Sequence, residues 1–247
     1  MLRRFWAVYE RILPRGVVAL ATVAAAAVTD PQSLGLYNWA ALAVTLIASV
    51  TDLPIRHLAV IHIGSPTGRR YLHRYAILAG GTGCAIMIAA VWLVASLAFT
   101  GPTLDGILLL CPLILIPPAQ ALAVQPVAQL QRAGLWAQVS LSRTISSVSG
   151  AAVGLPVVFL SRSVFGASLA LAFSELIFAA LVIVQARRLG SPGDESPGHS
   201  GPGIAGFWST YRHMTYYNAL GWVQGQAERV FLGLWAGTGA LGMYSLG

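Results

Sequence analysis

The chain has 247 residues, of which 56% are hydrophobic and 9% are charged, and its mean hydropathy is +0.71. Soluble domains carry about 25% charged residues, so this composition excludes a soluble globular domain, a disordered protein and a disulfide-stapled secreted domain. At about 20 apolar residues for each crossing, the length accommodates roughly seven membrane crossings. We therefore expect an all-α polytopic membrane helical bundle of about seven transmembrane helices.

Seven apolar runs separated by turn residues are the candidate membrane helices. They cover residues 12–30, 36–56, 76–99, 105–127, 137–160, 164–186 and 209–238. The stretch from Gly190 to Gly203 has no apolar residue to bury, which is typical of a flexible linker. The expected organisation is an amino-terminal six-helix lobe (1–188), a cytoplasmic linker (189–206) and the first helix of a second, truncated lobe (207–247).

The fifteen basic residues are all arginine and are distributed unevenly. Thirteen of them flank the start of the first span or lie near the connections that follow even-numbered spans; Arg162 and Arg229 are the other two. Because cytoplasmic loops are enriched in Lys and Arg, this pattern predicts a cytoplasmic amino terminus and a cytoplasmic linker. A rival interpretation of the amino terminus is a secretory signal, since Arg3 and Arg4 precede an apolar stretch over residues 16–28.

The sequence lacks the residue motifs that several classes of enzyme require. Without lysine, the chain cannot contain the Gly-x-x-x-x-Gly-Lys-Ser/Thr loop of an ATPase. Cys84 and Cys111 lie inside apolar runs and predict neither a disulfide nor a zinc site. No hydrolase, metalloprotease or clustered-carboxylate motif is present. The sequence therefore predicts no enzyme and no cofactor, and cytoplasmic arginines explain the basic charge without a nucleic-acid partner.

One short motif occurs twice, near the start and at the end of the chain. Leu34–Tyr37 reads L-G-L-Y and Leu241–Tyr244 reads L-G-M-Y. Each copy follows an apolar span at its predicted non-cytoplasmic end. This matched position favours a duplication in which the seventh span repeats the first, a construction that is common in secondary transporters.

Three places carry a resemblance to a known family: Leu34–Tyr37 with Asp52–Arg56, the connection between Arg132 and Arg143, and Glu228–Gly233 with Leu241–Ser245. The chain resembles the polysaccharide biosynthesis proteins, the oligosaccharide-lipid flippases of the multidrug/oligosaccharidyl-lipid/polysaccharide exporter superfamily. It departs from that pattern at Pro54, where the family often has glycine, and at Glu228, where it often has aspartate. Such proteins usually have twelve or more spans.

The resemblance implies two six-helix lobes around a central cavity. The implied cargo is a polyprenyl-diphosphate-linked oligosaccharide, moved across a bacterial cytoplasmic membrane for cell-surface polysaccharide, including lipopolysaccharide, biosynthesis. Membrane lipids, glycosyltransferases and a polysaccharide polymerase are the implied partners. We expect the intact protein to continue with about five or more further helices. Two other functions stay open: a drug/cation antiporter of the same superfamily, and a non-transporting scaffold of an envelope-synthesis complex, whose mid-membrane charges would pair with each other.

Three arginines are candidates for a cavity anion site, namely Arg11, Arg15 and Arg56. Arg11 and Arg15 lie one turn apart on one helix face, and guanidinium groups bind phosphate through paired hydrogen bonds. The alternative for these two is that they are anchors whose side chains reach the headgroups. The alternative for Arg56 is an ion pair with Asp52, and the cavity interpretation requires Pro54 to break the helix between them.

Four charged residues are candidates for proton or ion coupling: Glu175, Glu228, Arg229 and Asp52. Glu175 lies in the middle of the sixth span, with no basic residue in its own helix before Arg187. A carboxylate inside a membrane can exchange protons or bind a cation, or it can be a buried partner that fixes helix packing. Glu228 and Arg229 are adjacent in sequence, so they project in different directions and need not pair with each other.

Two spans have compositions that predict special geometry. The fourth span contains four prolines, which predict a kink or a break. They are Pro112, Pro117, Pro118 and Pro126. The fifth span is rich in small residues, including Gly150 and Gly154. Small residues favour close packing against another helix over a polar cavity wall.

Overall fold

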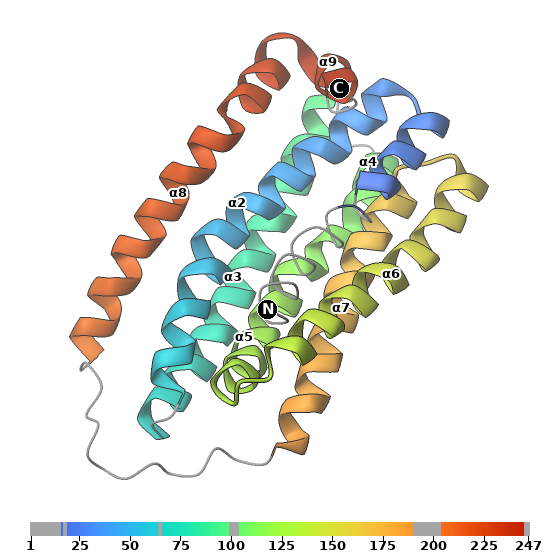
Figure 1. The fold of residues 1–247 in the computed structure, drawn as a ribbon. Coiled ribbons are helices and arrows are strands. Elements are labelled where there is room, and N and C mark those ends of the chain that lie inside the picture. Colours follow the sequence, from blue (N-terminus) through green and yellow to red (C-terminus); the bar gives the residue numbers. More distant parts are fainter. Residues whose placement is uncertain (1–15, 17–18, 64–65, 99–103, 190–203, 245–247) are drawn as a thin grey trace.

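The computed structural model describes residues 16, 19–63, 66–98, 104–189 and 204–244. Within these ranges the secondary structure is helical, and no strand is present (Figure 1). The described part of the chain is therefore an all-α bundle, as its composition predicts. The predicted linker, from residue 190 to residue 203, lies outside these ranges, as do Arg11 and Arg15.

Five helical segments in the described ranges are long and apolar enough to cross a membrane. They are Pro31–Val60, Gly68–Ser96, Gly106–Arg132, Trp136–Ser161 and Phe165–Arg188. These segments coincide with predicted spans two to six. A shorter apolar helix, Ala19–Val28, is the described end of the first predicted span. The chain is thus a multi-pass membrane protein.

The seventh predicted span, 209–238, is a helix but is not among the apolar five. Helix α8 (Ile204–Trp235) has 32 residues, and its polar positions are spread along its whole length. They include His213, Asn218, Glu228 and Arg229. The predicted helix is present, and its crossing of the membrane stays a prediction. A short helix, α9 (Gly237–Tyr244), follows after one turn residue.

Helix α2 (Pro31–His62) begins inside a stretch that the sequence assigns to a connection. Asp30 caps it, since its Oδ2 accepts the Ser33 N–H at 2.8 Å and its Oδ1 accepts the Ser33 hydroxyl at 2.7 Å. Pro31 occupies the first turn, where no intrahelical donor is needed. Pro54 lies inside the helix without breaking it, so the break that the cavity interpretation of Arg56 requires is absent. A contact from α8, described below, compensates for the hydrogen bond that Pro54 removes.

The fourth span is interrupted as its prolines predict. It consists of α4 (Leu104–Leu110), the 3-10 helix η1 (Cys111–Leu115) and α5 (Ile116–Arg132). Pro112 lies at the start of η1, and further prolines begin α5. Proline is tolerated at these positions because the first residues of a helix have no intrahelical acceptors for their N–H groups. The predicted break is confirmed, and its local form is five residues of the tighter 3-10 helix.

Helices α6 (Trp136–Ser161) and α7 (Phe165–Arg188) form a closely packed antiparallel pair. A Cβ atom added at Gly166 would lie 2.7 Å from the carbonyl oxygen of Gly154, and one added at Gly150 would overlap the carbonyl of Ala170. The backbones therefore approach too closely for larger residues at these points. The prediction that the small residues of the fifth span serve helix packing is confirmed.

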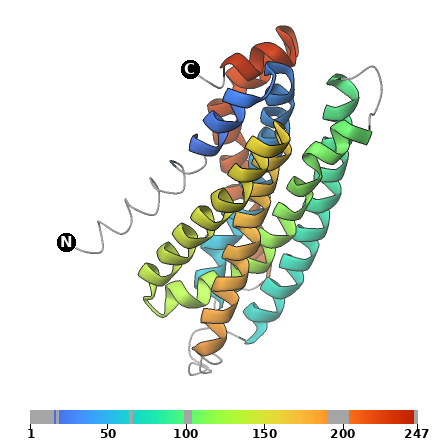
Figure 2. The ribbon, with the colours of Figure 1, turned by 90° about the vertical axis from the view of Figure 1, so that its right-hand side faces the viewer.

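The helices run up and down, so their ends gather at two opposite sides of the bundle (Figures 1 and 2). The start of α3 (Pro66–Ala98), the α5–α6 turn, the end of α7 and the start of α8 lie together in the lower part of Figure 1. We call this side the arginine-rich end. The arginines at these helix ends are Arg69, Arg70, Arg132, Arg187 and Arg188. Arg162 lies in the turn between α6 and α7, at the opposite end.

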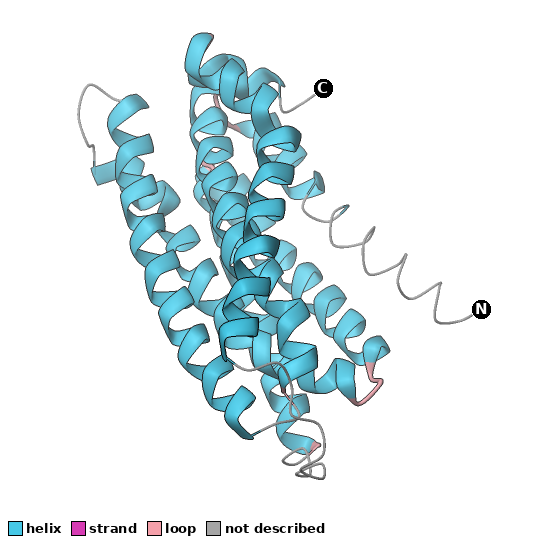
Figure 3. Cartoon of the chain, turned by 90° about the vertical axis from the view of Figure 1, so that its left-hand side faces the viewer, coloured by secondary structure: helices cyan, strands magenta, loops and turns pink. Residues whose placement is uncertain are grey.

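The two copies of the L-G-x-Y motif meet at the end opposite the arginines. Gly35 of α2 and Gly242 of α9 face each other so closely that a Cβ at Gly242 would lie 3.1 Å from the Gly35 nitrogen. A Cβ at Gly35 would overlap the carbonyl of Thr238. Leu34 and Leu241 are both buried. The repeated residues therefore form one contact between α9 and the first turns of α2. This contact lies within the all-helical bundle that Figure 3 shows.

Candidate functional site

Glu175, the isolated charge of the sixth span, is bound by Arg143 of the neighbouring helix. Arg143 Nη1 donates to Glu175 Oε1 at 2.8 Å, and the Arg143 guanidinium carbon lies 4.4 Å from the centroid of the Phe178 ring. The side chains of Arg143 and Glu175 are 23% and 15% exposed. This geometry matches the packing alternative for Glu175, because the ion pair joins α6 to α7. A role in ion coupling stays a prediction.

Further polar groups extend this contact into a polar seam between α6 and α7. Gln185 Nε2 donates to Ser142 Oγ at 2.9 Å. Several buried side-chain atoms of the described residues have no hydrogen-bond partner, and all of them belong to α6 or α7. They are Ser140 Oγ, Thr144 Oγ1, Ser168 Oγ, Glu175 Oε2 and Gln185 Oε1. An unpartnered polar atom is unfavourable in an apolar interior, so the seam has unused capacity for polar contacts.

Asp52 and Arg56 form an ion pair along one face of α2. The Arg56 Nε lies 2.7 Å from Asp52 Oδ2 and donates to Oδ1 at 2.8 Å. Asp52 is buried, with 7% of its side chain exposed, and Arg56 is 26% exposed. The guanidinium is thus directed at its helical neighbour, which is the ion-pair alternative for this residue.

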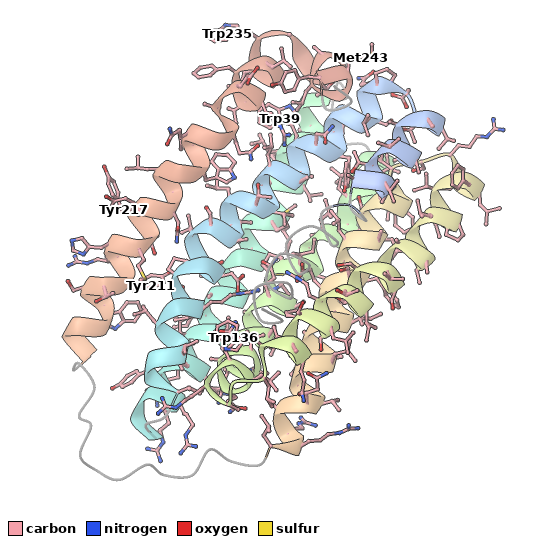
Figure 4. The ribbon with its side chains drawn as sticks, viewed as in Figure 1. Trp39, Trp136, Tyr211, Tyr217, Trp235 and Met243 are labelled. Atoms are coloured by element: carbon pink, nitrogen blue, oxygen red, sulfur yellow. The ribbon has the colours of Figure 1, made fainter. Side chains whose placement is uncertain are left out.

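Aromatic residues attach α8 to α2 and α3 beside this ion pair. Tyr211 of α8 points toward α2 (Figure 4), where its hydroxyl donates to the Val50 carbonyl at 3.0 Å. Tyr75 of α3 hydrogen-bonds to the Tyr211 hydroxyl and lies 3.3 Å from the Thr51 carbonyl oxygen. The two tyrosine rings meet edge to face, with centroids 5.1 Å apart. These hydrogen bonds join α8 to α2 and α3 in the half of the bundle nearer the arginine-rich end.

Glu228 and Arg229 lie on the exposed part of α8. Arg229 lines a small cavity of about 80 Å³ between α2 and α8, together with Asn38 and Gln226. Its Nη1 lies 3.4 Å from the Gln226 Oε1. The Glu228 carboxylate accepts a hydrogen bond from Tyr244 of α9, and this bond raises the pKa of the Tyr244 hydroxyl. The two adjacent charges therefore serve different contacts.

The predicted anion site is only partly described. Arg11 and Arg15 lie outside the described residues, and Arg56 is engaged by Asp52. Glu175 belongs to a separate pair on α6 and α7. Within the described ranges no group of three or more His, Cys, Asp or Glu side chains could hold a metal ion.

Sequence reasoning missed Arg143 and the two tyrosines. Its position near the connection after the fourth span groups Arg143 with the arginines that mark topology, and the helix of Glu175 offers no basic partner before Arg187. Its place inside the fifth span was the available signal, since an arginine that deep usually faces a partner. Tyr211 was inconspicuous in sequence, because aromatic residues also favour membrane interfaces without any partner.

The helical bundle and the comparison with family models point the same way. A family model described as polysaccharide biosynthesis protein matches residues 28–247. The chain belongs to this family. Comparison with curated proteins found no match, and comparison with solved structures found none. The resemblance stated from the motifs is confirmed at the level of a polysaccharide biosynthesis protein with membrane helices.

Proposed function

We propose that this polysaccharide biosynthesis protein is part of a transporter that flips a polyprenyl-diphosphate-linked oligosaccharide across a bacterial cytoplasmic membrane. The observation that carries the proposal is the family match over residues 28–247 of a chain rich in membrane-spanning helices. Sugar hydroxyls and a diphosphate lose their hydrogen bonds to water in hydrocarbon, so they need a polar path through protein. In this proposal the chain provides that path and performs no covalent chemistry.

The proposed path has its anion site at Arg11, Arg15 and Arg56. Guanidinium groups gathered in a cleft of low dielectric constant attract a diphosphate and bind it in a bidentate way. Asp52 holds Arg56 in the described structure, so it competes with the diphosphate for this arginine. The proposal therefore includes an exchange of partners at Arg56 when cargo binds.

One observation favours a second candidate, a non-transporting scaffold of an envelope-synthesis complex. Such a subunit is expected to pair its mid-membrane charges with each other, and both Asp52–Arg56 and Glu175–Arg143 are paired. A drug/cation antiporter is less favoured, since a site for cations should be rich in acids and poor in arginine.

Transport by the full-length protein tests the proposal. In a complementation strain, we expect Arg11→Ala/Arg15→Ala to abolish most transport and the corresponding Lys variants to retain part of it, because lysine keeps the charge but loses the bidentate geometry. Arg3→Ala/Arg4→Ala is the matched control, since these arginines are expected to be headgroup anchors. Normal transport by the Arg11/Arg15 alanine variant would refute the anion site.

Reconstitution separates transporter from scaffold. The purified full-length protein is placed in liposomes with a lipid-linked oligosaccharide, and the fraction that reaches the opposite leaflet is measured. A flippase moves the cargo without other proteins. A scaffold leaves the cargo in its original leaflet, although the cell still requires the protein for polysaccharide synthesis.

A further inference from the structure

A long groove opens on a face of the bundle formed by α3, α5 and α7. Its volume is about 820 Å³. Neither α2 nor α8 contributes to its wall, so the groove is separate from the Asp52–Arg56 pair and from the tyrosine contact. Of the charged residues proposed for cargo binding or coupling, none that the structure describes lines it. The proposed transport function therefore gives no role to this groove.

The groove has two chemically different parts. At the arginine-rich end, Arg69 and His73 of α3 and Arg187 of α7 line it. Farther along α3 the wall is apolar and includes Ile77 and the glycine pair at residues 80–81. Arg69 and Gly80 are eleven residues apart, which corresponds to about 16 Å along a helix. Gln125 and Gln129 of α5 also line the groove. A cationic entrance thus leads into a mainly apolar channel that can hold part of an acyl chain.

Glycine residues make room for this channel. Gly80 lies where α3 approaches α5, since a Cβ there would lie 3.1 Å from the Ala121 Cβ. The neighbouring Gly81 faces open space, because a Cβ there would meet nothing within 4 Å. Glycine inside a helix is unfavourable by about 1 kcal/mol relative to alanine, so packing alone gives no reason for Gly81. The missing side chain keeps the groove open.

The charges along the groove favour an anion at one end. Among the described residues, no Asp or Glu lines the groove. The carboxylates of Asp52 and Glu175 are engaged by their own arginines on other faces. Guanidinium groups bind phosphate in a bidentate way, and basic pockets between membrane helices at the cytoplasmic side bind anionic lipid headgroups. A small soluble anion would use the cationic end but leave the apolar length empty.

We propose that this groove binds an anionic phospholipid of the bilayer. Arg69 and Arg187 hold the headgroup phosphate, His73 lies beside them, and an acyl chain lies along α3 past Gly81. The bound lipid joins α3, α5 and α7 at the arginine-rich end. This inference does not depend on the proposed transport function, because Arg56, the described residue of the proposed cargo site, does not line the groove.

Native mass spectrometry of the full-length protein in detergent tests the site. With added phosphatidylglycerol we expect one retained lipid per chain. Phosphatidylcholine of the same chain length should be retained much more weakly, and millimolar inorganic phosphate should not displace phosphatidylglycerol. Equal retention of both lipids, or displacement by inorganic phosphate, would overturn the proposal. Displacement by an equal concentration of polyprenyl diphosphate would also overturn it and assign the groove to cargo.

Two kinds of variant locate the site. Arg69→Ala/Arg187→Ala should weaken phosphatidylglycerol retention by about tenfold or more, as expected for lost charge-assisted hydrogen bonds. Arg70→Ala/Arg188→Ala removes the same charge from the adjacent residues, which do not line the groove, and should leave retention unchanged. Gly81→Leu should fill the channel and weaken retention without a backbone clash. Equal losses in both arginine variants, or full retention by folded Gly81→Leu, would contradict the proposal.

Discussion

Tyr211 on α8 donates its hydroxyl hydrogen to the carbonyl oxygen of Val50 on α2. Val50 lies four residues before Pro54, so its carbonyl is the acceptor that the missing proline N–H would have used. In a membrane, such a carbonyl has no water to bind. Pro54 thus creates an acceptor on α2, and α8 supplies the donor. This relationship explains how α2 remains a continuous helix and why α8 attaches at this level.

We expect Tyr211→Phe to lower the free energy of unfolding by about 1–2 kcal/mol, because the interhelical hydrogen bonds of its hydroxyl to the Val50 carbonyl and to Tyr75 are lost while the ring is kept. Reversible denaturation in detergent measures the change. Tyr217→Phe is the matched control, since Tyr217 is 80% exposed and points away from the bundle (Figure 4).

A double-mutant cycle tests whether Pro54 is the cause. Pro54→Ala restores the backbone donor for the Val50 carbonyl, so the effect of Tyr211→Phe should become smaller in that background. An unchanged effect would show that the tyrosine stabilises α8 independently of the proline.

The Arg143–Glu175 pair gives a second prediction. Arg143→Ala leaves the mostly buried Glu175 without its cation and should cost about 3 kcal/mol of stability. The apolar double variant Arg143→Met/Glu175→Leu should recover most of that loss, because no charge then remains in the seam. Denaturation of both variants in the same detergent measures the difference. A double variant as unstable as Arg143→Ala would mean that the charges themselves hold α6 and α7 together.

Close packing of the repeated motif gives a third prediction. Gly35→Ala should destabilise the contact between α2 and α9 by about 1–3 kcal/mol, because the added methyl group overlaps the Thr238 carbonyl. Gly239→Ala is the control, since a Cβ at that residue meets nothing within 4 Å. Thermal unfolding of the two variants should therefore differ clearly. Equal melting temperatures would show that α9 moves aside without cost.

The Asp30 cap predicts a dependence on pH. Partial burial by itself would raise the pKa of Asp30, but hydrogen bonds from Ser33 outweigh it and lower the pKa below the ordinary value of 3.8. Its contribution to stability is therefore complete above that value and is lost as the pH falls through the lowered pKa. Asp30→Ala should cost about 1 kcal/mol at neutral pH, and Asp30→Asn should keep the cap without this pH dependence. Unfolding measured between pH 7 and acidic pH checks both expectations, and identical pH profiles for Asp30 and Asn would contradict them.

The orientation of the bundle can be tested by cysteine labelling. We expect single cysteines at Ser191 and Thr103 to react from opposite sides of the membrane, because arginine asymmetry predicts that the linker is cytoplasmic. Replacing Cys84 and Cys111 first removes background labelling. Equal labelling of the two positions from outside the cell would contradict the predicted topology.

Hydropathy was sufficient to place the membrane helices, because burying about 20 apolar residues dominates the energetics of a crossing. It does not account for the polar residues of α8, whose partners on α2 and α9 only the folded chain brings near. Trp222, for example, donates its indole N–H to Thr45 at 3.0 Å, and Glu228 accepts a hydrogen bond from Tyr244.

The candidate site was harder to predict from the sequence. The Asp52–Arg56 pair follows from spacing along one helix and was foreseen as an alternative. The Arg143–Glu175 pair depends on the crossing angle and the rotation of α6 against α7. The small residues of these helices permit close packing but do not specify that angle or rotation. From the sequence, Pro54 indicates only a possible helix break. The hydroxyl that compensates for its missing N–H belongs to Tyr211, which lies 161 residues after Val50 in the chain.

The contact between Gly35 and Gly242 also sets an order of assembly. About 200 residues separate these glycines, and a ribosome that adds 5–20 residues per second needs about 10–40 s to make them. Throughout that interval the beginning of α2 is already synthesised, while the helix that will cover its glycine surface does not yet exist. Nascent α2 must therefore be shielded by lipid or by the insertion machinery until α9 emerges.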